Sequence, residues 1–114
     1  MKPPVKLKLR SRHWIVNEND EVILGNGRME ILANIEKTGS INQAAKAMKM
    51  SYKGAWSKIK ATEKHLHAKI VLADKRTGTR LTEEGKALVD KYKRLHQECC
   101  RADDDIFNQI FPAE

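Results

Sequence analysis

The stretch 38–66, which reads TGSINQAAKAMKMSYKGAWSKIKATEKHL, constrains the fold of this chain more than any other part of it. Ser40 and Gln43 have the S-x-x-Q spacing of a capping box and predict the start of one helix. Ser51 offers the N-cap of a second helix a few residues later. Two helices joined by so short a turn predict a helix-turn-helix, with Lys49 in the turn.

The second of these helices has two different faces on a wheel of 3.6 residues per turn. Its predicted inner side carries Tyr52, Ala55, Trp56, Ile59, Glu63 and Leu66. Its outer side carries Lys53, Gly54, Ser57, Lys58, Ala61 and Lys64. Small residues flanked by lysines suit a recognition helix, because small side chains permit a close approach and lysines neutralise phosphates.

Positive charge is concentrated around this helix. The chain of 114 residues has a formal net charge of +7; residues 1–81 hold 17 Lys and Arg against 7 Asp and Glu, and residues 82–114 hold 5 against 8. Residues 49–80 alone hold 9 basic and 2 acidic residues. Such a block is typical of a nucleic-acid interface. An ordinary solvated basic surface is the alternative, and a membrane-surface helix is disfavoured because the apolar side is needed for the core.

The length favours one domain over residues 1–114. Residues 1–4 are expected to be a loose end, and residues 1–24 a small β region. There, alternating Val5, Leu7 and Leu9 predict a half-buried strand, and a hairpin turns at residues 17–20. A helix near Arg28, ended by Gly39, completes a three-helix core over 28–66.

Beyond the core, the pattern at 70–81 is strand, basic loop, strand. This order directly after a recognition helix predicts a wing, with a solvated hairpin as the alternative. Thr82 is a good N-cap for a last helix over 82–111. The expected fold is mainly α with small β elements (α+β), a winged helix-turn-helix with an N-terminal β-hairpin and a long C-terminal dimerisation helix.

The last helix carries a heptad seam of Leu88, Tyr92, Leu95, Cys99, Ala102 and Ile106. A domain this small offers such a seam little to pack against, so we expect a two-fold homodimer through it. The alternative is that the helix folds back onto its own domain. Cys99 would face its symmetry mate, either as a small core residue or in a redox-dependent crosslink.

Other chemistries find little support. His13, His65, His67 and His96 lack the spacing of a metal site and have no cysteine or carboxylate cluster beside them, so no metal and no cofactor are expected. Asp103, Asp104 and Asp105 favour a solvated acidic run over a cation site. The sequence contains no recognisable nucleophile–base pair and no glycine-rich phosphate-binding loop, so no enzyme is expected. Without a signal peptide or a membrane span, a cytoplasmic protein is expected.

Several runs of the chain resemble the N-terminal domain of ModE-type molybdate-responsive transcription regulators. They are Gly25-Asn26-Gly27-Arg28, Thr38-Gly39-Ser40-Ile41, Ala44-Ala45, Met50-Ser51-Tyr52-Lys53, Ala55-Trp56 and Leu81-Thr82 with Gly85. The helix-turn-helix is also similar to that of LysR-type regulators. The resemblance implies a winged helix-turn-helix that dimerises through its long terminal helix and binds an inverted-repeat operator.

By the same resemblance, residues 51–53 meet DNA and Trp56 belongs to the core. The wing around Thr77-Gly78-Thr79 is shorter and poorer in glycine than is common in the family. Full-length members continue into molybdate-binding domains, which residues 1–114 do not include. The resemblance therefore implies a regulator with a link to molybdenum, and we expect it to lack a molybdate-binding domain.

The sequence thus predicts a sequence-specific regulator of double-stranded DNA. The expected DNA-binding residues are Ser40, Gln43, Ser51, Tyr52, Lys53, Gly54, Ser57, Lys58, Lys60, Lys64, Lys75, Arg76, Thr77 and Arg80. Those near the recognition-helix start are expected to reach base edges, and the lysines and arginines farther away to contact phosphates. The alternative function is an interaction module whose last helix pairs with a partner regulator or sensor.

Overall fold

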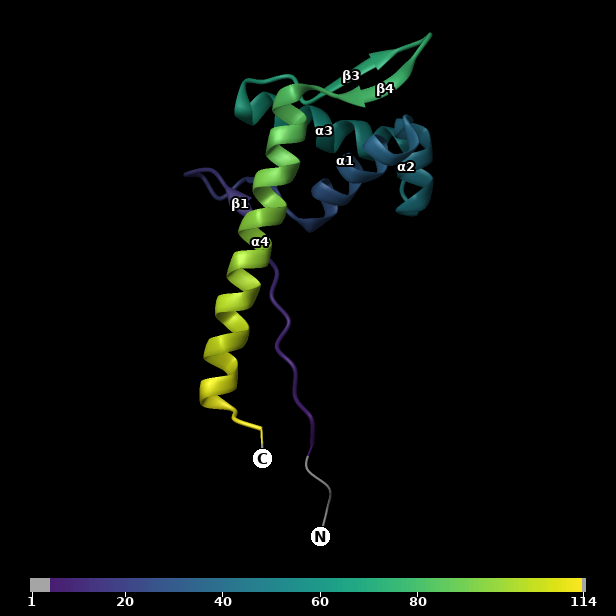
Figure 1. Cartoon of the computed structure of the whole chain (residues 1–114). Coiled ribbons are helices and arrows are strands. Elements are labelled where there is room, and N and C mark those ends of the chain that lie inside the picture. The colour runs from purple at the N-terminus through teal and green to yellow at the C-terminus, as the bar shows by residue number, and fades with distance from the viewer. Residues whose placement is uncertain (1–4, 114) are drawn as a thin grey trace.

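The computed structural model describes residues 5–113; the loose end expected at residues 1–4 lies outside them. Its helices are α1 (Asn26–Thr38), α2 (Ile41–Ala47), α3 (Tyr52–Leu66) and α4 (Glu83–Ile110). Its two sheets are antiparallel pairs, β1 (Ile15–Val16) with β2 (Val22–Leu24) and β3 (Val71–Asp74) with β4 (Gly78–Leu81). The expected class, mainly α with small β elements in a winged helix-turn-helix, is confirmed (Figure 1).

The core forms where α1, α2 and α3 cross. Ile31 and Ile35 of α1, Ala44 of α2 and Ala55 and Ile59 of α3 are all buried in one apolar cluster. The small side chains of Ala44 and Ala55 let the helix backbones approach closely, and the branched residues of α1 fill the space between them. The buried sides of the three helices therefore face one another in a single core.

The caps and turns of the helix-turn-helix follow from local sequence. The Ser40 hydroxyl oxygen accepts from the Gln43 N–H at 3.1 Å, while the Ser40 N–H donates to Thr38 Oγ1. The Gln43 side chain therefore does not close a full capping box. Gly39 is left-handed with φ 73°, as expected, and Lys49 is also left-handed with φ 55°. A non-glycine residue in that conformation costs about 1 kcal/mol.

The N-terminal expectations are only partly met. The hairpin of β1 and β2 exists, but Val5, Leu7 and Leu9 form no strand, and Val5 is 82 % exposed. Alternating polarity alone cannot hold a strand, because backbone groups need a neighbouring strand and residues 5–9 have none. These residues instead run extended beside α4 (Figure 1). Helix α1 also begins at Asn26, two residues before the expected start at Arg28.

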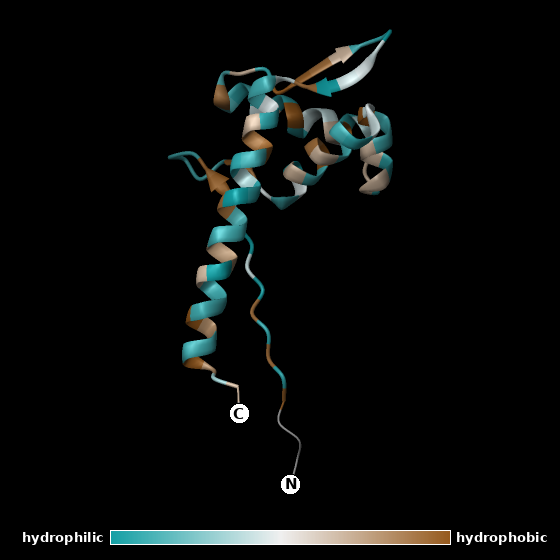
Figure 2. Cartoon of the chain, in the orientation of Figure 1, coloured by the Kyte–Doolittle hydropathy of each residue, from teal (hydrophilic) through white to brown (hydrophobic). Residues whose placement is uncertain are grey.

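Helix α4 begins on the core and extends well beyond it (Figure 1). The Thr82 hydroxyl caps it by accepting from the Gly85 N–H at 3.0 Å, with Glu83 and Glu84 in the first turn. Its far half is mostly hydrophilic, with separate apolar residues between the polar ones (Figure 2). Within residues 5–113, no helix combines the length and the apolar character that crossing a membrane requires.

The first part of the expected seam on α4 packs against its own domain. Tyr92 is 2 % exposed and donates its hydroxyl hydrogen to the His13 carbonyl oxygen at 2.9 Å. Leu88 is half-buried against the same core. The first turns of α4 therefore fold back onto the domain, which was the alternative expectation. Farther along, Leu95 is 43 % and Ile106 is 54 % exposed.

Candidate nucleic-acid interface

The first turn of α3 is capped by Ser51 and its outer face is exposed to solvent. The Ser51 hydroxyl oxygen accepts from the Gly54 N–H at 2.9 Å, which fixes the first turn. Lys53, Ser57 and Lys58 are exposed on the outer face of the helix, while Ala55 on the opposite face is fully buried. The sequence therefore placed the two faces of α3 correctly along its middle turns.

Gly54 has a local reason to be small. A Cβ at this position would lie 3.0 Å from the Ser51 hydroxyl oxygen and 3.7 Å from the Met50 methyl group. Any side chain would therefore press on the cap. The sequence explained Gly54 only by close approach to a polyanion, and the crowded cap adds a second cause.

The ends of α3 depart from the predicted wheel. Tyr52 and Leu66 were placed on the inner side, but both side chains are exposed. A wheel treats every turn alike, whereas the core covers only the middle of this helix. Tyr52 thus joins the outer surface, next to Lys53. Trp56, expected in the core, is half-buried against it.

Lys60 is oriented differently from the other lysines of α3. Its Nζ lies 3.1 Å from Glu63 Oε1 and 4.4 Å from the centre of the Trp56 ring. A carboxylate and an aromatic face thus already hold this ammonium group. Lys60 lies on the flank of the helix and is less available to a phosphate than Lys53, Lys58 and Lys64, which are exposed.

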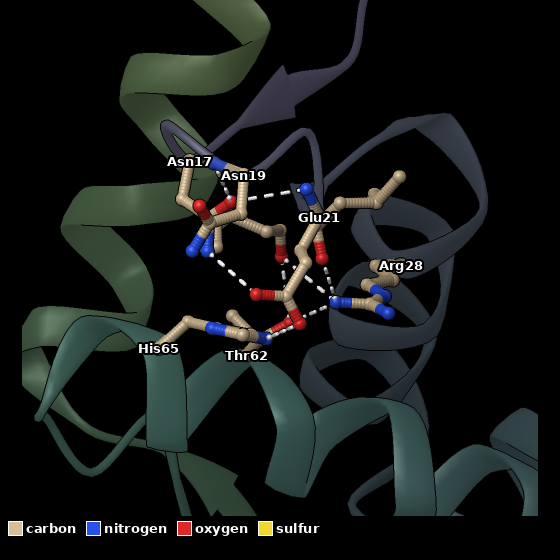
Figure 3. Close-up of polar contacts among 8 residues, drawn as sticks. Asn17, Asn19, Glu21, Arg28, Thr62 and His65 are labelled. Carbon is tan, nitrogen blue, oxygen red and sulfur yellow. Dashed lines mark hydrogen bonds and ion pairs between the residues drawn. The ribbon is translucent and has the colours of Figure 1, made fainter.

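A polar cluster behind α3 fixes the helix against the β1–β2 hairpin (Figure 3). Arg28 Nη1 donates to the Val22 carbonyl at 2.7 Å and to Thr62 Oγ1 at 3.1 Å, and the Thr62 hydroxyl donates to the Ile23 carbonyl at 2.7 Å. Burial lowers the pKa of Arg28. The sequence did not predict that Arg28 and Thr62 would hold the hairpin. A polar Thr62 beside Glu63 on the otherwise apolar side of the helix was the one indication of such a role.

Glu63 joins α3 to the wing. Its Oε2 accepts from the Ile70 N–H at 2.8 Å and from the Val71 N–H at 3.2 Å. Burial alone would raise the pKa of Glu63, but these hydrogen bonds and Lys60 hold it below its ordinary value. The sequence placed Glu63 inward without a role, although a lone acid amid so many lysines was a signal.

The tip of the wing is held by Asp74. Its Oδ1 accepts from the backbone N–H groups of Arg76 at 2.7 Å and Thr77 at 3.3 Å. The first of these bonds is the main cause that lowers the pKa of Asp74. The turn itself holds only Lys75, Arg76 and Thr77, because Gly78 already pairs with Asp74 in the ladder.

The first residues of β4, next to the tip of the wing, rest on the loop between α1 and α2. The Thr79 N–H donates to the Gly39 carbonyl oxygen at 2.9 Å. Gly78 has φ 87°, and a Cβ there would lie only 2.8 Å from the same oxygen. Two glycines, one from each segment, therefore allow wing and core to touch.

Apart from Lys60, the cations predicted on α3 and the wing form no ion pair with a carboxylate among residues 5–113. Among residues 5–113, carboxylate contacts within 4.0 Å involve Lys60, Lys86, Arg101, His13 and His65. The remaining predicted cations of α3 and the wing are in none of these pairs; they are Lys53, Lys58, Lys64, Lys75, Arg76 and Arg80. Their uncompensated charge creates a positive potential that attracts a polyanion.

The two residues predicted on the preceding helix differ in availability. Gln43 is exposed. Ser40 is half-buried, and its oxygen accepts the cap hydrogen bond, while its hydroxyl hydrogen can still be donated to a phosphate oxygen. Both lie at the start of α2.

The structure corrects one expectation about the histidines. His13 and His96 lie together, with their Nδ1 atoms 2.8 Å apart, and Cys100 lies beside them. The sequence predicted no such grouping, because 83 positions separate His13 from His96 and only the fold brings them together. His65 and His67 lie elsewhere: His65 faces Glu21 and His67 ends α3.

Comparison with known families identifies the central part of this fold. Residues 27–86 match the family described as bacterial regulatory helix-turn-helix protein, lysR family. The chain is 33 % identical over 91 residues to the molybdenum transport protein ModE of Azotobacter vinelandii, covering 76 % of this chain and 34 % of that protein. It is 34 % identical over 87 residues to the molybdenum-pterin-binding protein MopB of Rhodobacter capsulatus, covering 73 % and 32 %. The chain thus spans about a third of the length of these relatives.

Solved structures agree on the fold. The DNA-binding domain of CbnR, in a crystal structure with DNA, superposes with a TM-score of 0.61 at 19 % identity, over 73 % of this chain and 94 % of that one. Full-length LysG from Corynebacterium glutamicum gives 0.56 at 20 % identity, over 73 % and 28 %.

Proposed function

This chain belongs to the lysR family of bacterial regulatory helix-turn-helix proteins, and we propose that it binds an inverted-repeat operator as a homodimer. As in the ModE-type regulators that it resembles, the first part of the proposal is sequence-specific recognition of double-stranded DNA. One observation carries it: α3 is capped and buried on one side, and on the other it presents Lys53, Lys58 and Lys64, which pair with no carboxylate among residues 5–113.

In this proposal α3 enters the major groove with its first turns foremost. Lys53 and Ser57 reach base edges, since residues near the start of a recognition helix approach the bases most closely. Ser51 and Gly54 bring the backbone close, and Tyr52, exposed beside them, contacts the DNA backbone. Lys58 lies on the same exposed face and completes the contact.

Phosphate contacts surround this centre. Lys64 extends them along α3, and the start of α2 adds Ser40 and Gln43. The wing contributes Lys75, Arg76, Thr77 and Arg80, all exposed. Lys60 has a smaller share, because Glu63 and Trp56 hold its ammonium group.

Dimerisation is proposed through the part of α4 that its own domain leaves uncovered. Leu95, Cys99, Ala102 and Ile106 share one side of the helix, and Leu95 and Ile106 are exposed. Leu88 lies at the edge of this seam, and Tyr92 stabilises α4 from within its own chain. A two-fold pair would present two α3 helices to half-sites about one helical turn of DNA apart, or slightly more.

The experiment is DNA binding across a salt series, on genomic fragments that include the region upstream of the protein's own gene. A fragment-selective complex with a steep salt slope is the expected result. Weak binding that is equal on all fragments would contradict an operator and favour the interaction module. In that function α4, with its acidic residues Asp103 to Asp105, would pair with a partner protein.

Lys53→Ala tests the base-reading role. We expect the selected fragment to lose about 1–3 kcal/mol of binding free energy and its preference over other fragments. Lys93→Ala, which removes an exposed lysine from α4, is the matched control and should leave binding unchanged. An equal loss on every fragment would instead show Lys53 to be a phosphate contact.

The similarity to ModE and MopB, both named for molybdenum, supports a narrower proposal, an operator at genes connected with molybdenum. Such a regulator acts in the cytoplasm. Footprinting on fragments upstream of molybdate-transport genes tests it, with unrelated promoters as controls.

A further inference from the structure

A cluster of metal-binding side chains lies away from the proposed DNA interface, where the N-terminal segment passes α4. His13 comes from that segment, and His96 and Cys100 lie one turn apart on the helix. One donor atom from each residue lies within 4.8 Å of the others. All three side chains are half-buried, so they are ordered and still reachable.

We propose that His13, His96 and Cys100 bind one divalent transition-metal ion, of which Zn²⁺ is the best match. Two imidazoles and a thiolate are a donor set that Zn²⁺ favours, whereas Ca²⁺ and Mg²⁺ require oxygen. A helical pair four residues apart is also a common metal-binding element, because both side chains leave the same face.

The distances fit an ion after small side-chain shifts. Zinc–ligand bonds of about 2.0–2.3 Å in a tetrahedron hold their donor atoms roughly 3.4–3.6 Å apart. The two Nδ1 atoms of His13 and His96 lie 2.8 Å apart, and Cys100 Sγ lies 3.9 Å from His96 Nδ1 and 3.6 Å from its Nε2. The distance between the two Nδ1 atoms must widen, and the distance from Cys100 Sγ to His96 Nδ1 must shorten slightly. Rotation about the side-chain bonds allows both changes.

The surroundings orient the ligands as metal sites usually do. Asp103 Oδ2 lies 3.8 Å from His13 Nε2, the ring nitrogen that faces away from His96. A carboxylate that accepts the other ring N–H of a ligating histidine fixes the ring and raises its basicity, and a small side-chain shift would bring Asp103 within hydrogen-bond distance. The Tyr92 hydroxyl donates to the His13 carbonyl oxygen, which holds the N-terminal segment against α4. An ion here would fasten residues 83 positions apart in the sequence.

The competing explanation is a plain hydrogen bond between the two imidazoles. One neutral ring can donate and the other accept at 2.8 Å without any ion. That explanation gives Cys100 and Asp103 no part in metal binding, so variants of these residues separate the two cases.

The test is a titration of the purified, tag-free chain with Zn²⁺ by calorimetry and with Co²⁺ by absorption. We expect one equivalent per chain and a thiolate-to-cobalt charge-transfer band. His96→Gln and Cys100→Ser should weaken binding by more than about 100-fold, since even removing an outer partner typically costs about 10–100-fold. Asp103→Asn should fall within that smaller range, which gives a milder variant should the others unfold.

Matched controls are available in the same chain. Cys99→Ser removes the adjacent thiol and should keep the cobalt band, and His65→Gln removes a histidine outside the cluster. Circular dichroism shows whether each variant is folded. Absence of stoichiometric binding, or equal binding by Cys100→Ser and Cys99→Ser in folded protein, would overturn the proposal.

Discussion

Gly85 shows how one residue secures the joint between wing and α4. A Cβ at this position would collide with the Ile70 carbonyl oxygen, which also accepts from the Thr82 N–H. We expect Gly85→Ala to destabilise the protein by about 1–3 kcal/mol, because inserting a methyl group into a packed site forces the backbone to shift. Urea unfolding measures the change.

Gly27 is the control for that substitution. It lies in the first turn of α1, and beyond its chain neighbours and the backbone of its own helix no heavy atom of the described residues lies within 4 Å of a Cβ built there. Gly27→Ala should be neutral or stabilise by up to about 1 kcal/mol, because alanine favours a helix. Equal effects of the two substitutions would contradict the role of close contact at Gly85.

Glu63 makes stability depend on pH. Its pKa lies below the ordinary value, so its carboxylate stabilises the folded state above the unfolded pKa of about 4.3, and this stabilisation is lost as the pH falls through the folded pKa. We expect Glu63→Gln to lower the free energy of unfolding by about 1–3 kcal/mol at pH 7, with a smaller difference at pH 3. Urea unfolding at both pH values checks this.

Glu36→Gln is the matched control, because Glu36 is exposed on α1. It should change the free energy of unfolding little at either pH. A Glu63→Gln effect of the same size at pH 3 and pH 7 would show that the carboxylate charge does not matter and that only the shape of the side chain does.

Elements whose determinants are local could be predicted from the sequence. Ser40, Ser51 and Thr82 each accept a hydrogen bond from the backbone N–H three residues later. The starts of α2, α3 and α4 could therefore be predicted from short stretches of sequence. The strand expected at 5–9 failed, because strands depend on a partner distant in the sequence. For the same reason the sequence could not show that Glu63 and the start of β3 bind each other.

The wing is the element whose contribution to binding is simplest to isolate. Lys75 and Arg76 are exposed at its tip, and Asp74 holds the turn through backbone N–H groups that side-chain truncation leaves intact. We expect Lys75→Ala with Arg76→Ala to weaken binding about equally on all DNA sequences. The salt slope should fall by about 1 for each phosphate that the variant no longer neutralises. Binding titrations over a salt series measure both effects.

A double variant of Lys91 and Lys93 to alanine removes the same charge from α4 and serves as the control. Its salt slope should match that of the unchanged chain. A wing variant that binds the operator more weakly but other DNA as before would show that the wing reads bases or groove shape instead.

At the scale of the whole molecule, α4 has two roles that the heptad pattern alone could not separate. Its 28 residues span about 42 Å at 1.5 Å per residue, in a molecule 64 Å long. Tyr92 is buried by its own domain, whereas Leu95 and Ile106 farther along the seam are exposed and Cys99 between them is half-buried. A periodic apolar pattern shows which side of a helix is buried, but not which partner buries it.

The uncovered seam leads to the last prediction. Leu95→Glu with Ile106→Glu places four like charges across a two-fold interface, so we expect a monomer in sedimentation equilibrium. Relative to the unchanged chain, the variant should lose much more affinity for a paired operator than for a single half-site. Gln97→Glu with Asn108→Asp adds the same charge on the opposite side of α4 and should remain dimeric. A seam variant that stays dimeric would place the interface elsewhere. An unchanged chain that is already monomeric would favour the partner-binding function, since α4 would then await a different chain.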